Sequence, residues 1–99
     1  MNKYFINQNM MIRTRIRELE EGSVAIIVGY EQAYGGYIGK LIKMGLKPDT
    51  QFVVLCTTCE EGAVEILLKE KIIKLSKSEA DALCVEEIDE IWKGDIFID

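Results

Sequence analysis

The hydrophobic positions of this chain follow two different periods. Several short runs are rich in valine and isoleucine or alternate with polar residues, which is the pattern of strands packed on a core. Between two of these runs, apolar residues recur every three or four positions, as they do in an amphipathic helix. The pattern predicts strands at 23–30, 51–57, 63–69, 71–75 and 84–88 and helices at 33–45 and 77–83.

The longer predicted helix has a well-marked end. Gly45 can take the left-handed conformation just past the last turn, which lets Leu46 fold back toward Leu41. Pro48 follows and prevents the helix from continuing. One apolar stripe of this helix consists of Tyr34, Tyr37, Ile38, Leu41 and Ile42, which either covers the core or docks a partner.

Three glycines weaken the first half of this helix prediction. Gly35, Gly36 and Gly39 each cost up to about 1 kcal/mol of helix stability relative to alanine. Either another group approaches the backbone closely there, or the first turn is not a regular helix.

The second predicted helix begins with a capping box. The hydroxyl of Ser76 can accept a hydrogen bond from the amide of Glu79, whose carboxylate can reach back to the Ser76 amide. The order of elements predicts a mainly β fold: a small closed barrel of about five strands, with one helix after the first strand and a short helix before the last. Such closure leaves no free strand edges.

Length and composition predict one folded domain in a 99-residue chain. We expect a flexible arm at 1–11, the domain at 12–88 and an acidic, aromatic tail at 89–99. In that tail, Trp92 and Phe97 could anchor the segment on a second copy of the chain. Because no apolar run approaches about 18 residues and the start lacks a signal peptide, we expect a cytoplasmic protein without membrane insertion.

The charge distribution argues against a nucleic-acid partner. The formal net charge is −5, and residues 78–99 carry eight acidic side chains against a single lysine. Nucleic-acid binding usually needs a surplus of basic groups to neutralise phosphates. Arg13, Arg15 and Arg17 alternate and would share one face of a strand, but we interpret them as a solvated face.

No constellation of catalytic residues is present in the sequence. The chain has no histidine, which excludes serine–histidine and cysteine–histidine catalysis. The adjacent carboxylates Glu86 and Glu87 would point to opposite faces of a strand. We therefore expect a protein that is not an enzyme.

The segment LCTTCEEG holds the most specific candidate chemistry. Cys56 and Cys59 have the spacing of half a zinc or iron site, and Cys84 could add a third thiolate if the fold brings it near. A redox dithiol is a second hypothesis, although such motifs usually lie at helix N-termini rather than in hairpins. Alternatively, Cys56 and Cys84 simply fill core positions.

The segment YIGKLIKMGLKPDTQFVVL resembles the signature of the FeoA family. In that family a helix ends in Arg-Leu-x-x-Met/Leu-Gly-Leu and runs through Pro-Gly-Thr into a strand. The segments ELEEGS and VEILLKEKIIKLSKSEADALCVEE resemble the family's Leu-x-x-Gly turn and its closing hairpin, helix and strand, so the resemblance covers about 16–88. Lys40 stands where the family has arginine, which loses a forked donor, and Asp49 stands where it has glycine.

The resemblance implies an SH3-like barrel without enzymatic activity. It also implies a role beside FeoB, the membrane transporter of ferrous iron, whose cytoplasmic part the protein would bind and modulate. The exposed edge of the predicted helix is the predicted docking surface, since glycine permits close approach and tyrosine is favoured at interfaces. Its residues are Tyr34, Tyr37, Gly39, Lys40 and Met44. The alternative hypothesis is a metal-responsive module that binds a divalent ion, iron or zinc, through Cys56 and Cys59.

Overall fold

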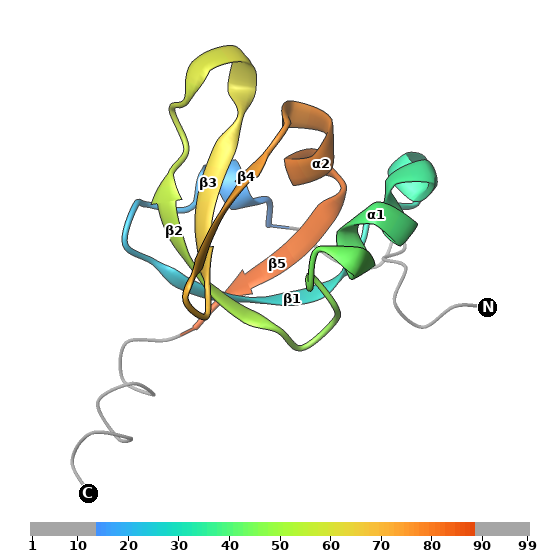
Figure 1. Ribbon diagram of the computed structural model, residues 1–99, viewed down its shortest axis with the longest axis horizontal. Coiled ribbons are helices and arrows are strands. Elements are labelled where there is room, and N and C mark those ends of the chain that lie inside the picture. The colour runs from blue at the N-terminus through green and yellow to red at the C-terminus, as the bar shows by residue number, and fades with distance from the viewer. Residues whose placement is uncertain (1–13, 89–99) are drawn as a thin grey trace, which may run out of the picture.

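The computed structural model describes residues 14–88 (Figure 1). The predicted arm at 1–11 and the predicted tail at 89–99 lie outside the described residues, as does Arg13. The part of the chain that is described folds around a single antiparallel sheet with short helices at its rim.

The sheet has five strands in the order β4-β3-β2-β1-β5, and every neighbouring pair is antiparallel. This confirms the predicted mainly β fold with a helix after the first strand and a short one before the last. The strands are β1 (Val24–Tyr30), β2 (Gln51–Cys56), β3 (Val64–Leu68), β4 (Lys71–Leu75) and β5 (Leu83–Glu87). The helices are η1 (Ile16–Glu18), η2 (Gln32–Tyr37), α1 (Ile38–Lys43), η3 (Glu60–Gly62) and α2 (Lys77–Asp81), of which the η elements are 3-10 turns.

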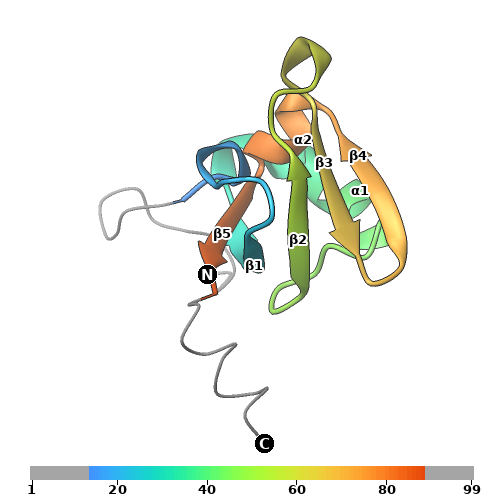
Figure 2. The same cartoon turned by 90° about the vertical axis from the view of Figure 1, so that its left-hand side faces the viewer.

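The sheet curls so that its two edge strands come to lie on either side of α2 (Figures 1 and 2). Helix α2 connects β4 to β5 and packs on both strands. Within residues 14–88 the strand order runs from β4 to β5 without a ladder between them. The barrel is therefore closed at this seam by packing of α2, and not by hydrogen bonds between the first and last strands.

The core lies inside the curled sheet. In β1 and β3, alternate side chains point inward, as the period of two predicted. The largest side chains that are completely or almost completely buried are Phe52, Ile16, Ile27, Leu41, Leu46, Ile66, Leu75 and Leu83. Helix α1 contributes Leu41 to this core, which fixes how the helix sits against the sheet.

The predicted end of the first helix is confirmed. Gly45 has φ +98°, and its amide donates to the carbonyl of Ile42 at 3.0 Å. The amide of Leu46 returns to the carbonyl of Leu41 at 3.0 Å, and both leucine side chains are fully buried. This arrangement caps the carbonyls that a helix end leaves unpaired.

The start of the predicted helix is different from a regular α-helix. Residues 32–37 form the 3-10 turn η2, with a kink at Tyr34 (φ −111°, ψ 31°) before α1 begins. A side-chain carbon built at Gly35, Gly36 or Gly39 would meet no atom within 4 Å. The glycines therefore do not accommodate another part of this domain, and the irregular first turn is the alternative that holds.

Candidate functional site

The predicted docking residues lie together on η2 and α1. We call Tyr34, Tyr37, Gly39, Lys40 and Met44 the η2–α1 surface. The rings of Tyr34 and Tyr37 are 6.3 Å apart and tilted by 50°. Tyr34 and Met44 are half-buried and pack against the core, whereas Tyr37, Gly39 and Lys40 are exposed. Part of the surface is thus fixed by packing against the core, and the rest is accessible to a partner.

Of the exposed large apolar side chains, Tyr37 belongs to this surface. Among residues 14–88, three large hydrophobic side chains are exposed, and two of them, Tyr37 and Ile42, belong to η2 and α1. The third, Ile72, lies on β4 and is 68% exposed. Beside Tyr37, the open backbone at Gly36 and Gly39 would let a partner approach closely.

Lys40 ties this surface to α2. Its ammonium lies 2.5 Å from Oε2 of Glu79, whose side chain is only 7% exposed. Burial alone would raise the pKa of Glu79, but the hydrogen bond from Lys40, those from Ser76 and the charge of Lys40 outweigh it, so the pKa of Glu79 is lowered. The same hydrogen bond raises the pKa of Lys40. The predicted docking lysine is thus also a structural contact between α1 and the capping box of α2.

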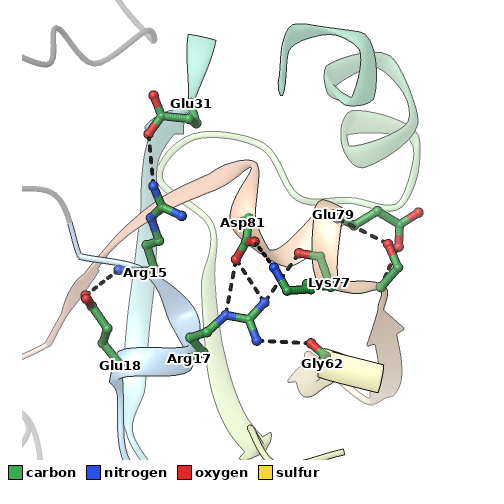
Figure 3. Close-up of polar contacts among 9 residues, drawn as sticks. Arg15, Arg17, Glu18, Glu31, Gly62, Lys77, Glu79 and Asp81 are labelled. Carbon is green, nitrogen blue, oxygen red and sulfur yellow. Dashed lines mark hydrogen bonds and ion pairs between the residues drawn. The ribbon is translucent and has the colours of Figure 1, made fainter. Parts of the chain in front are cut away.

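Arg17 forms the centre of a polar cluster between η1, α2 and the loop before β3 (Figure 3). Its Nη2 and Nε donate to Oδ1 of Asp81 at 2.8 and 3.2 Å. Its Nη1 donates to the carbonyl of Gly62 at 3.2 Å, and Nη2 also reaches the carbonyl of Lys77 at 3.4 Å. The interpretation of Arg17 as part of a solvated face is therefore wrong, because the half-buried side chain is bound to Asp81, Gly62 and Lys77.

Asp81 is held ionised by this cluster. Its burial would raise its pKa, but the hydrogen bonds and charge of Arg17, with a smaller contribution from Lys77, keep the pKa below its usual value. Arg15, two residues before Arg17, instead faces Glu31 at 3.8 Å. Sequence reasoning did not find these pairs, since no local spacing connects Arg15 or Arg17 with a partner on a distant element.

The structure brings Cys56 and Cys59 together. The Sγ of Cys59 donates a hydrogen bond to the Sγ of Cys56 at 2.9 Å, and the Sγ of Cys56 lies 3.8 Å from Oγ1 of Thr58. Both thiols are free and half-exposed. A β-bulge between Val54 and Cys56 takes Cys56 out of the inward alternation of β2, so it does not fill the core.

Cys84 does not join them. It is 3% exposed and pairs with Gly29 near the end of β1, whereas Cys56 lies beyond Val53, which pairs with Val24 at the start of β1. Between residues 14 and 88, no three side chains of His, Cys, Asp or Glu come close enough to hold a metal ion. The predicted three-thiolate set is not assembled in this part of the chain, and Cys84 occupies a core position.

A basic hollow borders the η2–α1 surface. It has a volume of about 670 Å³ and lies between the end of α1 and the β3–β4 hairpin. Its charged lining is four lysines and Glu70, around Met44 and Leu68. The lysines are Lys43, Lys47, Lys69 and Lys71. In a chain of net charge −5, this is a local surplus of positive charge suited to an acidic segment of a partner.

The comparison with protein families gives one match over most of the chain. The model of the FeoA domain matches residues 14–87. No curated protein sequence matches the chain. Within residues 14–88, no helix is long and apolar enough to cross a membrane.

Solved structures share the fold at low sequence identity. An iron uptake regulatory protein (FeoA) superposes with a TM-score of 0.64 at 22% identity, over 79% of this chain and 100% of that chain. An FeoA-like protein from Clostridium acetobutylicum gives 0.67 at 23% identity, over 82% and 93% of the two chains. A manganese-dependent transcriptional repressor in complex with manganese gives 0.69 at 14% identity, over 80% of this chain but only 38% of the repressor.

Proposed function

The chain belongs to the FeoA family, and we propose that it is a non-enzymatic accessory protein of ferrous-iron uptake that binds and modulates a FeoB-type transporter. The family model spans residues 14–87, which is nearly the whole described domain. One structural neighbour carries the description of an iron uptake regulatory protein, and this chain covers that neighbour completely. Docking on the cytoplasmic part of the transporter requires this chain to reside in the cytoplasm.

The observation that carries the proposal is the exposed tyrosine at the junction of η2 and α1. Tyr37 is 37% exposed, and the backbone at Gly36 and Gly39 beside it is open. An exposed tyrosine beside accessible backbone is a favourable anchor for a partner, because aromatic side chains carry much of the energy of protein interfaces. The neighbouring lysines of the basic hollow add attraction for carboxylates of the partner.

The test is a binding measurement with the purified cytoplasmic domain of the FeoB-type transporter from the same organism. Tyr37→Ala should weaken binding about tenfold or more, which corresponds to a loss of about 1.4 kcal/mol. Ile72→Ala is the matched control, because it also removes an exposed large hydrophobic side chain, but from β4. Its affinity should stay within about threefold of the unmodified protein.

Three outcomes would contradict the proposal. Failure of the unmodified chain to bind the transporter domain at physiological salt would show that the transporter is not the partner. Equal weakening by Tyr37→Ala and Ile72→Ala would remove the η2–α1 surface as the docking site. If Tyr37→Ala instead dissolves a homo-oligomer measured by sedimentation, the surface joins copies of this chain and is not the docking site for the transporter.

A further inference from the structure

Cys56 and Cys59 form a thiol pair to which the docking function assigns no role. Their Sγ atoms lie 2.9 Å apart. A disulfide bond is about 2.05 Å long, so an approach of about 0.9 Å separates the reduced pair from a covalent bond. Among the described cysteines, only these two are close to one another and accessible, because Cys84 is buried in β5.

The backbone holds the two thiols in this position from both sides. Cys56 is the last residue of β2 and pairs with Glu65 of β3. After Cys59 the chain turns through η3, where Glu61 and Gly62 both have positive φ, at 60° and 79°. The carbonyl of Gly62 is bound by Arg17, which anchors this turn to the body of the domain. The loop between the cysteines is therefore short and tethered at each end.

We propose that Cys56 and Cys59 are a thiol–disulfide exchange site, in which Cys56 attacks a small-molecule disulfide and Cys59 resolves the mixed disulfide. The proposal does not depend on the docking function. It also differs from a metal site, for which residues 14–88 offer no third side chain of His, Cys, Asp or Glu beside the two thiols.

The hydrogen bonds of the pair assign the two roles. The bond from the Cys59 thiol, with further bonds from the backbone N–H and hydroxyl of Thr58, lowers the pKa of Cys56. The pKa of Cys59 is raised to about 11, mainly by that same hydrogen bond to Cys56 and then by its partial burial. Cys56 is thus the thiol that ionises first, and the attacking species in exchange is the thiolate.

The reaction balances with a disulfide RSSR as the only oxidant. The Cys56 thiolate forms a bond to one sulfur of RSSR, the S–S bond of RSSR breaks, and RS⁻ leaves and takes up a proton. The Cys59 thiol then loses its proton and attacks the Sγ of Cys56, which expels the second RS⁻. Two protein thiols are oxidised to one disulfide, and RSSR is reduced to two molecules of RSH.

The experiment uses the full chain, fully reduced, in native buffer with glutathione disulfide as the probe. After an acid quench, intact mass and free thiols are measured in denaturant. The expected result is the loss of two of the three thiols, together with the mass of two hydrogens, in a monomeric product. Cys59→Ser should stop at a species that carries one glutathione, because the resolving thiol is gone.

Cys84→Ser is the matched control, and it should still lose two thiols and form the same internal disulfide. The proposal is overturned if the unmodified chain keeps all three thiols, accumulates a stable glutathione adduct, or forms only disulfide-linked dimers. It is also overturned if Cys84→Ser blocks the oxidation. Since the first readout is on the unmodified chain, a variant that fails to fold does not decide the result.

Discussion

Arg17 and Asp81 are 64 residues apart in the sequence, yet the guanidinium donates two hydrogen bonds to a single carboxylate oxygen, Oδ1 of Asp81. Two further N–H groups of Arg17 reach the carbonyls of Gly62 and Lys77. One side chain thus ties η1, α2 and the turn before β3 together at the seam of the barrel (Figure 3). Between these segments, side-chain hydrogen bonds have the stabilising role that hydrogen bonds between neighbouring strands have elsewhere in the sheet.

Replacing Arg17 by alanine should lower the free energy of unfolding by about 2 kcal/mol, because it leaves the buried Asp81 carboxylate with much weaker compensation. Urea denaturation monitored by circular dichroism measures the change. Arg17→Lys is the control, because lysine keeps the positive charge but cannot donate to Asp81 and to the carbonyl of Gly62 at the same time. Its loss of unfolding free energy should therefore be smaller than that of Arg17→Ala. Equal stability of Arg17→Ala and the unmodified protein would contradict the structural role.

The stability should fall at acid pH through Asp81 and Glu79. The pKa of each carboxyl is lower in the folded protein than in the unfolded chain, so the unfolded state binds protons first as the pH drops. Their stabilisation is present above the unfolded pKa values, near 4, and is lost as the pH falls through the lower folded values. Urea titrations from about pH 7 to about pH 3 should show a shallower decline for Asp81→Asn than for the unmodified chain. If the stability of both proteins declines equally with falling pH, Asp81 does not contribute to the loss of stability at acid pH.

The sequence predicted those parts of the molecule that depend on local chemistry. The helix end at Gly45 and the capping box of Ser76 and Glu79 are both present, because each involves residues a few positions apart. The left-handed conformation of Asp49, with φ 72°, is likewise a local property. Strand positions followed from the alternation of apolar residues, which one buried face imposes.

Contacts that join distant segments could not be predicted from spacing. Nothing around Arg17 indicates that Asp81 will lie beside it, and the alternation with Arg15 pointed instead to a solvated face. The proximity of Cys56 and Cys59 followed from their spacing, but the separation of Cys84 depends on its register opposite Gly29. In the same way, the capping box placed Glu79 on α2 but could not show that its other oxygen meets Lys40.

Two glycines of the α1 region should respond to alanine in opposite directions. Gly45 has φ +98°, and a Cβ there would lie 3.1 Å from Cδ2 of Leu68, so Gly45→Ala should cost about 2 kcal/mol of stability. Gly39 lies within α1 with no atom within 4 Å of a built Cβ. Gly39→Ala should therefore stabilise the domain by up to about 1 kcal/mol through helix propensity. Thermal unfolding of both variants checks the signs, and a stabilised Gly45→Ala would contradict the left-handed helix end.

The capping box of α2 gives a prediction with a control two residues after the cap. The Ser76 hydroxyl accepts from the Glu79 amide at 3.2 Å, and Oε1 of Glu79 accepts from the Ser76 amide at 2.9 Å. Ser76→Ala removes the first bond and should lower the free energy of unfolding by about 1 kcal/mol. Ser78→Ala lies inside the helix, where alanine is the better helix former, and should change stability by less than about 0.5 kcal/mol.

The carboxylate of Glu79 also binds Lys40, so Glu79→Gln should be more damaging than Ser76→Ala, since it weakens both the cap and the contact with α1. Urea denaturation of the three variants measures this order. A Ser78→Ala loss as large as that of Ser76→Ala would show that α2 responds to any substitution. The specific hydrogen bonds at its first turn would then not be what positions it between β4 and β5.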